Sequence, residues 1–143
     1  MCLSGGDFLN VIVCLDDNNG MLFNNRRQSR DKKVLDDIFS LVGDKKLFIA
    51  GFSEKLFSEY GGELVVDDSF LNIADNADFC FVENCCLQSS LEKIEKIIVY
   101  KWNRVYPADF VCDIDFSLFS ISEETELVGN SHEKITRLIY ERG

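Results

Sequence analysis

Short apolar segments alternate with stretches of helical spacing along most of this chain. Lys46 to Ala50 is such a segment, and Gly51 is followed at once by a helix-like pattern. Phe8 to Leu15 is a nearly continuous apolar and β-branched run, which is typical of a central strand covered on both faces. Further strands are predicted over Glu63–Val66, Phe79–Val82 and Ile97–Trp102. This alternation predicts a mostly parallel sheet with connecting helices.

Helices are predicted between these strands. Ser29 can cap a helix that begins at Arg30, and apolar side chains then recur at helical spacing until Gly43 ends it. Asp16 to Gln28, before this helix, is predicted to be a long polar loop. Shorter helical segments are predicted over Phe52–Tyr60, Asp68–Ile73 and Asn84–Lys93.

The last third of the chain has a different pattern, with no helix between its apolar segments. Leu118 to Leu127 and Lys134 to Glu141 are joined by Gly129-Asn130, which is typical of an antiparallel hairpin. The sequence therefore predicts a three-layer α/β/α fold in a single domain over residues 1–143. Its central sheet is expected to be mixed and mostly parallel, with about eight strands and the hairpin at its edge.

Composition narrows the class of protein. The chain has 143 residues, of which 46% are apolar, and this suits one folded domain. No apolar run approaches the roughly 18 residues that span a bilayer, and Met1 to Asp7 lacks the features of a signal peptide. We therefore expect a cytoplasmic protein without a membrane segment.

The cysteines and the single histidine do not indicate a metal site. Their spacing lacks the pairs that metal sites use, so we expect reduced, mostly buried thiols and no metal. His132 follows the turn at Gly129-Asn130, so a solvated side chain is expected. Tyr100 and Trp102 are expected to pack in the core. The cysteines are Cys2, Cys14, Cys80, Cys85, Cys86 and Cys112.

The chain is acidic, with a net charge of -10, which argues against nucleic-acid binding. The charge is uneven, because the segment from Arg26 to Lys46 carries +3 and the remainder -13. Ligands of mostly parallel sheets bind at the carboxyl ends of the strands. The loops predicted at that edge are Asp16–Gln28, Gly51–Ser53, Asp67–Ser69 and Glu83–Cys86.

The order of these elements resembles the dihydrofolate reductase family. Asp17 to Gly20, after the first strand, is similar to the entry into that family's active-site loop. Leu47 to Gly51 resembles its strand ending in Met-Gly-Arg, and Leu138 to Arg142 resembles its C-terminus. The resemblance covers nearly the whole chain. It implies a dihydrofolate-reductase-like fold, and for a working enzyme of that family it implies NADPH as cofactor.

The family's catalytic carboxylate is missing from its expected position. Family members follow the loop with Leu-Pro-Trp and place the acid at the start of the next helix. Spacing from Leu35 and Ile38 puts Lys33 or Val34 there. Asp31 is the nearest carboxylate, and using it shifts the register by two or three residues, which turns Leu35 and Ile38 away from the core. No catalytic residue is assigned, and Asp31 is the candidate only for a displaced acid.

The family's contacts to the phosphates of NADPH are also replaced. Gly51 is followed by Phe52 and Glu54 where the family has Gly-Arg-x-Thr. Asp67-Asp68 stand where it has Ser and Arg, and Glu83-Asn84 replace its adjacent glycines. Each lost or reversed charge contact costs on the order of 1 to 3 kcal/mol. We therefore expect no cofactor and assign no cofactor-binding residue.

These observations predict a non-catalytic member of this fold, a pseudoenzyme that binds a protein partner. The contact residues are expected on the segment from Asp16 to Lys33, because aromatic and arginine side chains are enriched at interface hot spots. The opposite charge of the remaining surface also allows weak homo-oligomers. Two alternatives remain, a small-ligand-binding protein that uses the residual cleft and a divergent NADPH-dependent dihydrofolate reductase. The expected contact residues are Phe23, Arg26, Arg27 and Arg30.

Overall fold

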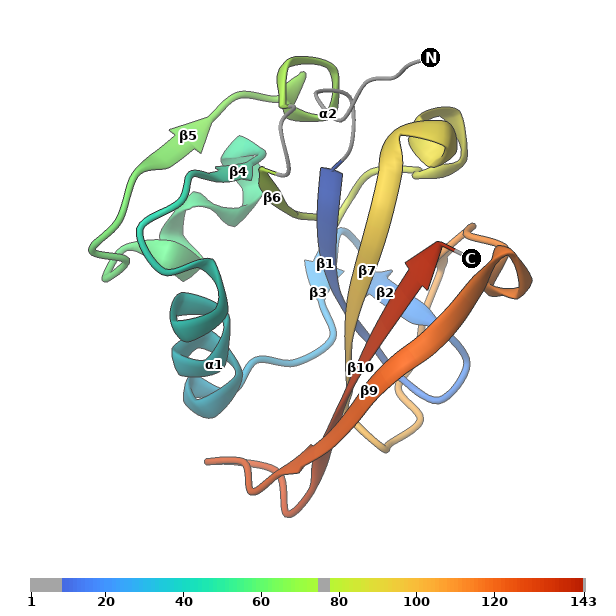
Figure 1. Ribbon diagram of the computed structural model, residues 1–143. Helices are drawn as coiled ribbons and strands as arrows, with labels where there is room; N and C mark the ends of the chain where they lie inside the picture. Colours follow the sequence, from blue (N-terminus) through green and yellow to red (C-terminus); the bar gives the residue numbers. More distant parts are fainter. Residues whose placement is uncertain (1–8, 75–77, 143) are drawn as a thin grey trace.

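The computed structural model describes residues 9–74 and 78–142, and is built around a seven-stranded sheet (Figure 1). The strand order in this sheet is β5-β4-β6-β1-β7-β10-β9. The described residues leave out Met1 to Phe8, which include Cys2. The strands of the sheet are β1 (Leu9–Leu15), β4 (Leu47–Ile49), β5 (Leu64–Val66), β6 (Phe79–Phe81), β7 (Ile94–Lys101), β9 (Phe119–Leu127) and β10 (Ile135–Arg142).

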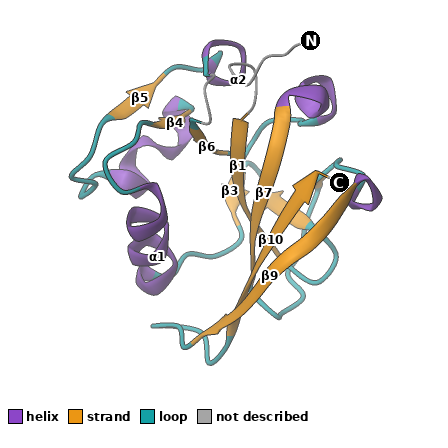
Figure 2. Ribbon diagram, in the orientation of Figure 1, coloured by secondary structure: helices purple, strands orange, loops and turns teal. Residues whose placement is uncertain are grey.

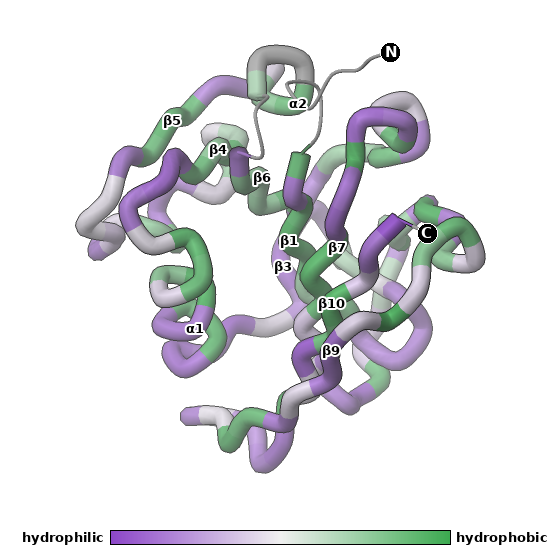
Figure 3. Tube along the Cα trace, viewed as in Figure 1, coloured by the Kyte–Doolittle hydropathy of each residue, from purple (hydrophilic) through white to green (hydrophobic). Residues whose placement is uncertain are grey.

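The five strands from β5 to β7 in this order run parallel. β1 pairs with β6 and β7, and β4 pairs with β5 and β6, all in parallel register. Six of the seven residues of β1 are buried, which confirms the prediction of a central strand covered on both faces. Figure 3 shows the corresponding concentration of hydrophobic residues along β1 and its neighbours.

The C-terminal hairpin forms the antiparallel edge of the sheet, as predicted (Figure 2). β10 pairs with β7 on one side and with β9 on the other, and Ile135 lies opposite Leu127 next to the connecting loop. The register shifts once, between Ile139 and Tyr140. With this hairpin the sheet is mixed and mostly parallel, which confirms the predicted fold class.

One face of the sheet is covered by the longest helix, α1 (Lys32–Val42). Its buried side chains are those of Val34, Ile38 and Val42, and Gly43 ends it in the left-handed region at a φ of 60°. The helix begins two residues later than predicted. The reason is that the Asp31 carboxylate, and not the Ser29 hydroxyl, accepts a hydrogen bond from a backbone amide of the first turn.

The remaining helices are short. Phe70 and Leu71 of α2 (Phe70–Ile73) pack in the core of the other face. Residues 84–87, predicted to be helical, are not, because the Asp113 carboxylate accepts hydrogen bonds from the amides of Leu87 and Gln88. The 3₁₀ helices within residues 9–74 and 78–142 are η2 (Gly51–Phe57), η3 (Gln88–Lys93) and η4 (Phe116–Leu118).

The predicted loop between Asp16 and Gln28 contains regular structure. Strands β2 (Gly20–Phe23) and β3 (Arg26–Arg27) form a hairpin, and β2 also pairs with β8 (Phe110–Val111) in a second sheet. The prediction of a loop without strands was wrong. The strand that pairs with β2 is β8, which lies far along the chain and could not be recognised from the local pattern. Among the described residues, no helix is both long and apolar enough to cross a bilayer.

Candidate functional site

The candidate site is a cleft at the carboxyl ends of the central parallel strands, between α1, η2 and the segment that follows β6. Its remaining cavity measures about 20 Å³, which is room for a single water molecule. The cleft is therefore filled by the protein's own side chains. The lining residues include Cys14, Met21, Arg27, Gln28, Ser29, Asp31, Val34, Leu56, Phe81, Glu83 and Trp102.

An ion pair between Arg27 and Glu83 closes the cleft. The guanidinium donates from Nε and from its terminal nitrogen to the two carboxylate oxygens, at 2.6 and 2.8 Å. Glu83 also accepts a hydrogen bond from the Ser53 hydroxyl at 2.7 Å, and the guanidinium carbon lies 5.4 Å from the centre of the Phe52 ring. The hydrogen bond to Glu83 raises the pKa of Arg27 further above its ordinary value. Its charge is thus balanced inside the protein.

A second carboxylate occupies the N-terminal end of η2. The Asp68 side chain accepts a hydrogen bond from the Gly51 amide at 2.9 Å. The adjacent Asp67 accepts one from the amide of Ser69 at 2.8 Å. Backbone amides at the start of a helix are the groups that bind phosphate oxygens in many proteins. Here the amide of Gly51 is already bound by a fixed negative charge, so a phosphate would have to displace Asp68.

Asp31 is buried and surrounded by donors. Its carboxylate accepts hydrogen bonds from the amides of Lys33, Asn130 and Ser131 at 2.9, 2.8 and 2.7 Å. Burial opposes ionisation, but the hydrogen bonds from Asn130, His132, Ser131 and Lys33 outweigh it and hold the pKa of Asp31 well below its ordinary value. Asp31 therefore joins the start of α1 to the loop of the β9–β10 hairpin as a structural anion.

His132 is buried beside Asp31, so the prediction of a solvated histidine was wrong. Its Nδ1 lies 3.0 Å from an oxygen of Asp31. Its Nε2 lies 3.0 Å from the Ser29 hydroxyl and 3.1 Å from the Tyr106 hydroxyl. The ring also stacks on Trp102, with 4.7 Å between the centroids. Trp102 and Tyr100 are both buried in the core, as predicted.

The four predicted contact residues separate into two groups. Phe23, with 42% of its surface exposed, lies on the outside together with Arg26 and Arg30. Arg27 points into the cleft, and only 25% of its side chain is exposed. The alternation of side chains along a strand explains the difference between the neighbouring arginines. No local sequence pattern indicates the partnership of Arg27 with Glu83, which is 56 positions away.

An open groove adjoins the closed cleft. It measures about 320 Å³ and lies between α1, η2 and the loop of the hairpin. Arg30, Lys32 and Lys55 line it, together with the apolar side chains of Leu35 and Phe39. Among the residues that the structure describes, no group of three or more His, Cys, Asp or Glu side chains is arranged to hold a metal ion.

Comparison with known proteins bears on the fold alone. No protein-family model matches the sequence, and no curated protein matches it. A solved structure of dihydrofolate reductase from Enterococcus faecalis, complexed with NADP(H) and RAB-propyl, is similar to this chain with a TM-score of 0.69. The similarity covers 99% of both chains, at 11% sequence identity. The chain therefore has a dihydrofolate-reductase-like fold.

Proposed function

We propose that this chain is a dihydrofolate-reductase-like protein without reductase activity, and that it acts in the cytoplasm by binding a protein partner. The observation that carries the proposal is the Arg27–Glu83 ion pair, which fills the cleft with a fixed contact. A ligand would have to break this contact before it could enter, and the cost would be subtracted from its binding free energy.

The two other carboxylates of the site support the same conclusion. Asp68 already binds the Gly51 amide, so NADPH would meet a negative charge where its phosphates need a donor. Asp31, the only candidate for a displaced acid, is held by three backbone amides and stays ionised. Such a carboxylate has no proton to give at neutral pH. This opposes the alternative of a divergent reductase.

The partner surface is proposed on Phe23, Arg26 and Arg30, which are exposed around the β2–β3 hairpin and the start of α1. The Asn24 amide donates a hydrogen bond to Asp109 at 3.0 Å, which ties the turn of this hairpin to the segment before β8. A fixed turn that carries one aromatic and two guanidinium groups suits docking. Because Arg27 points inward, it is omitted from this surface.

Free thiols support the cytoplasmic part of the proposal. Disulfides are rare in the reducing cytoplasm, where cysteines stay as thiols. Five cysteines of the described residues are free: Cys14, Cys80, Cys85, Cys86 and Cys112.

The first experiment tests ligand binding. Purified protein is melted alone, with NADPH and with an antifolate, and we expect no shift of the midpoint. A ligand at 100 times its dissociation constant adds about 2.7 kcal/mol and would raise the midpoint by several degrees. A shift with the antifolate alone would favour the small-ligand alternative, which the open groove of about 320 Å³ could serve. A shift with NADPH, together with turnover of dihydrofolate, would refute the proposal.

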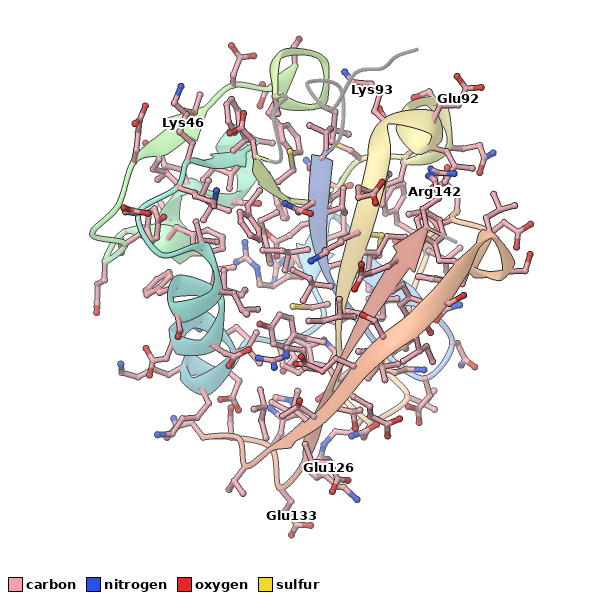
Figure 4. All side chains as sticks on the ribbon, viewed as in Figure 1. Lys46, Glu92, Lys93, Glu126, Glu133 and Arg142 are labelled. Atoms are coloured by element: carbon pink, nitrogen blue, oxygen red, sulfur yellow. The ribbon has the colours of Figure 1, made fainter. Side chains whose placement is uncertain are left out.

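The second experiment tests the partner surface with matched charge reversals. Arg26→Glu/Arg30→Glu is compared with Lys45→Glu/Lys46→Glu, which changes the charge equally at exposed positions. Lys46 lies beyond the C-terminal end of α1 (Figure 4), and an 11-residue helix is about 16 Å long. We expect the first pair alone to lose a partner that the parent retains in a pull-down from its native cell. Equal retention by both variants would contradict the proposed surface.

Sizing of the same proteins at low and high salt tests the homo-oligomer. If the basic surface meets the acidic surface of a second copy, the parent will associate at low salt and dissociate at high salt. Arg26→Glu/Arg30→Glu will then stay monomeric at both. A parent that is monomeric at every salt concentration removes self-association from the proposal and leaves a different protein as the partner.

A further inference from the structure

Two side chains that precede α1 and one from the loop of the β9–β10 hairpin form a relay beside the cleft. The Ser29 Oγ lies 3.0 Å from Nε2 of His132, and Nδ1 of the same ring lies 3.0 Å from an oxygen of Asp31. A hydroxyl, an imidazole and a carboxylate in this order are the parts of an activated nucleophile. We propose that Ser29 is such a nucleophile, which is acylated by small reactive esters with His132 as its base.

Asp31 sets the proton position on the imidazole. The three backbone amides that donate to it keep the carboxylate ionised and hold its pKa below the ordinary value. An ionised carboxylate can only accept, so Nδ1 of His132 carries the proton. In the neutral imidazole, Nε2 then carries the lone pair that faces the hydroxyls of Ser29 and Tyr106. Asp31 acts through His132 and is a positioning residue.

The imidazole is fixed in this orientation. Only 4% of the His132 side chain is exposed, and its ring stacks on Trp102. The groups that face it are the carboxylate of Asp31 at one nitrogen and the hydroxyls of Ser29 and Tyr106 at the other. A base that is held by packing and by hydrogen bonds loses little entropy when it accepts the proton of the nucleophile.

Ser29 is accessible from the cleft. It is half-buried and lines the cavity of about 20 Å³. This volume admits one water molecule, so an ester must displace lining side chains to reach Ser29, and a small acyl group such as acetyl is expected rather than a long chain. The inference goes beyond partner binding and needs no NADPH.

Tyr106 competes with Ser29 for the imidazole. Its hydroxyl lies 3.1 Å from the same Nε2, at nearly the distance of the Ser29 hydroxyl. Nε2 has a single lone pair in the plane of the ring, so the two hydroxyls cannot both donate to it along that axis. Removal of the Tyr106 hydroxyl should therefore increase the fraction of molecules in which Ser29 is activated.

The reaction balances with the groups present. Oγ of Ser29 bonds to the ester carbonyl carbon while its proton moves to Nε2 of His132. The bond from that carbon to the leaving oxygen then breaks, and His132 returns the proton to the departing alcohol. A water molecule can repeat the sequence on the acyl-serine, which yields the carboxylic acid and free Ser29.

The test uses p-nitrophenyl acetate and a small fluorophosphonate on the full chain, with peptide mapping of the modified residue. We expect modification at Ser29, no modification at that site in Ser29→Ala, and a rate lower by at least about 100-fold in His132→Gln. Ser117→Ala is the matched control. The Ser117 hydroxyl donates a hydrogen bond to the Asp115 carboxylate, whereas the hydroxyl next to Nε2 of His132 is that of Ser29. Its removal should leave the rate unchanged.

Tyr106→Phe gives a second reading that does not depend on the stability of the His132 variant. We expect it to fold and to be modified at Ser29 a few times faster than the parent. Absence of modification at Ser29 in the parent would overturn the proposal. So would an unchanged rate in folded His132→Gln, or modification of Tyr106 in place of Ser29.

Discussion

The Arg27 guanidinium and the Glu83 carboxylate form a two-point ion pair, with hydrogen bonds of 2.6 and 2.8 Å, across the cleft of a dihydrofolate-reductase-like fold. The pair joins β3 to the segment that follows β6. It also closes the cleft, since the two side chains line the space between α1 and η2. Each charge satisfies the other, so the site is both closed and electrically balanced.

The variant Glu83→Gln should lower the free energy of unfolding by roughly 1 to 3 kcal/mol. The one oxygen of glutamine can still accept from Ser53 or Arg27, but the charge of Arg27, only 25% exposed, loses the negative charge that balances it. Urea unfolding measures the change. Glu126→Gln is the control, because Glu126 pairs with Lys134 where both side chains are more than half exposed, and its loss should be much smaller. Equal losses in both variants would contradict a structural role for the Arg27 pair.

Asp31→Asn should cost about 2 to 4 kcal/mol of unfolding free energy. Asparagine has one acceptor oxygen for the amides of Lys33, Asn130 and Ser131, and its own amide group faces donors. Urea unfolding again gives the value. Asp36→Asn, at an exposed pair with Lys32, should be nearly neutral. Native-like stability of Asp31→Asn would mean that the carboxylate does not hold the hairpin loop to α1.

Acid should destabilise the protein through Asp31. Its pKa is lowered in the folded chain, so the unfolded chain binds the proton at higher pH. The stabilisation is therefore complete above the unfolded value of about 3.9 and is lost as the pH falls below it. Asp16 also has a lowered pKa, because hydrogen bonds from Tyr106 and Gly20 outweigh burial, and it contributes with the same sign. Urea midpoints between pH 7 and pH 3 should fall less steeply in Asp31→Asn than in the parent, and parallel curves would exclude Asp31 as the source.

Gly129→Ala should destabilise the hairpin loop by about 1 to 3 kcal/mol. A methyl group there would lie 2.5 Å from the carbonyl oxygen of His132 and 2.8 Å from the carboxylate of Asp31. Gly61→Ala is the matched control, since nothing lies within 4 Å of the added methyl group. Thermal melts of the two variants should differ by several degrees. Equal melting temperatures would mean that the loop relaxes around the methyl group.

Thiol reactivity should follow burial. Burial raises the pKa of Cys80 to about 12 and raises that of Cys14 above its ordinary range, so both should resist alkylation in the native protein. Cys86 is exposed and should be alkylated first. Peptide mapping before and after urea distinguishes each site. Rapid native alkylation of Cys80 would contradict the burial of β6.

The sequence by itself determined the elements that depend on local patterns. The run from Leu9 to Leu15 is apolar on both faces, so it could only be a central strand. Gly43 ends α1 because glycine adopts a positive φ without strain, and the residue type alone indicates this end of the helix. The hairpin around Gly129-Asn130 followed from alternation and turn residues.

Only the tertiary structure decided what these residues do to one another. Arg27 and Glu83 are 56 positions apart, and Ser29 and His132 are 103 apart, so no local pattern reports their contact. Asp31 replaced Ser29 as the helix cap because the hairpin loop supplies two further amides to its carboxylate. The side chains that fill the cleft are ordinary polar residues in sequence. Their function depends on which strand ends the parallel sheet brings together, because hydrogen bonds and charges act over a few ångströms in space rather than along the chain.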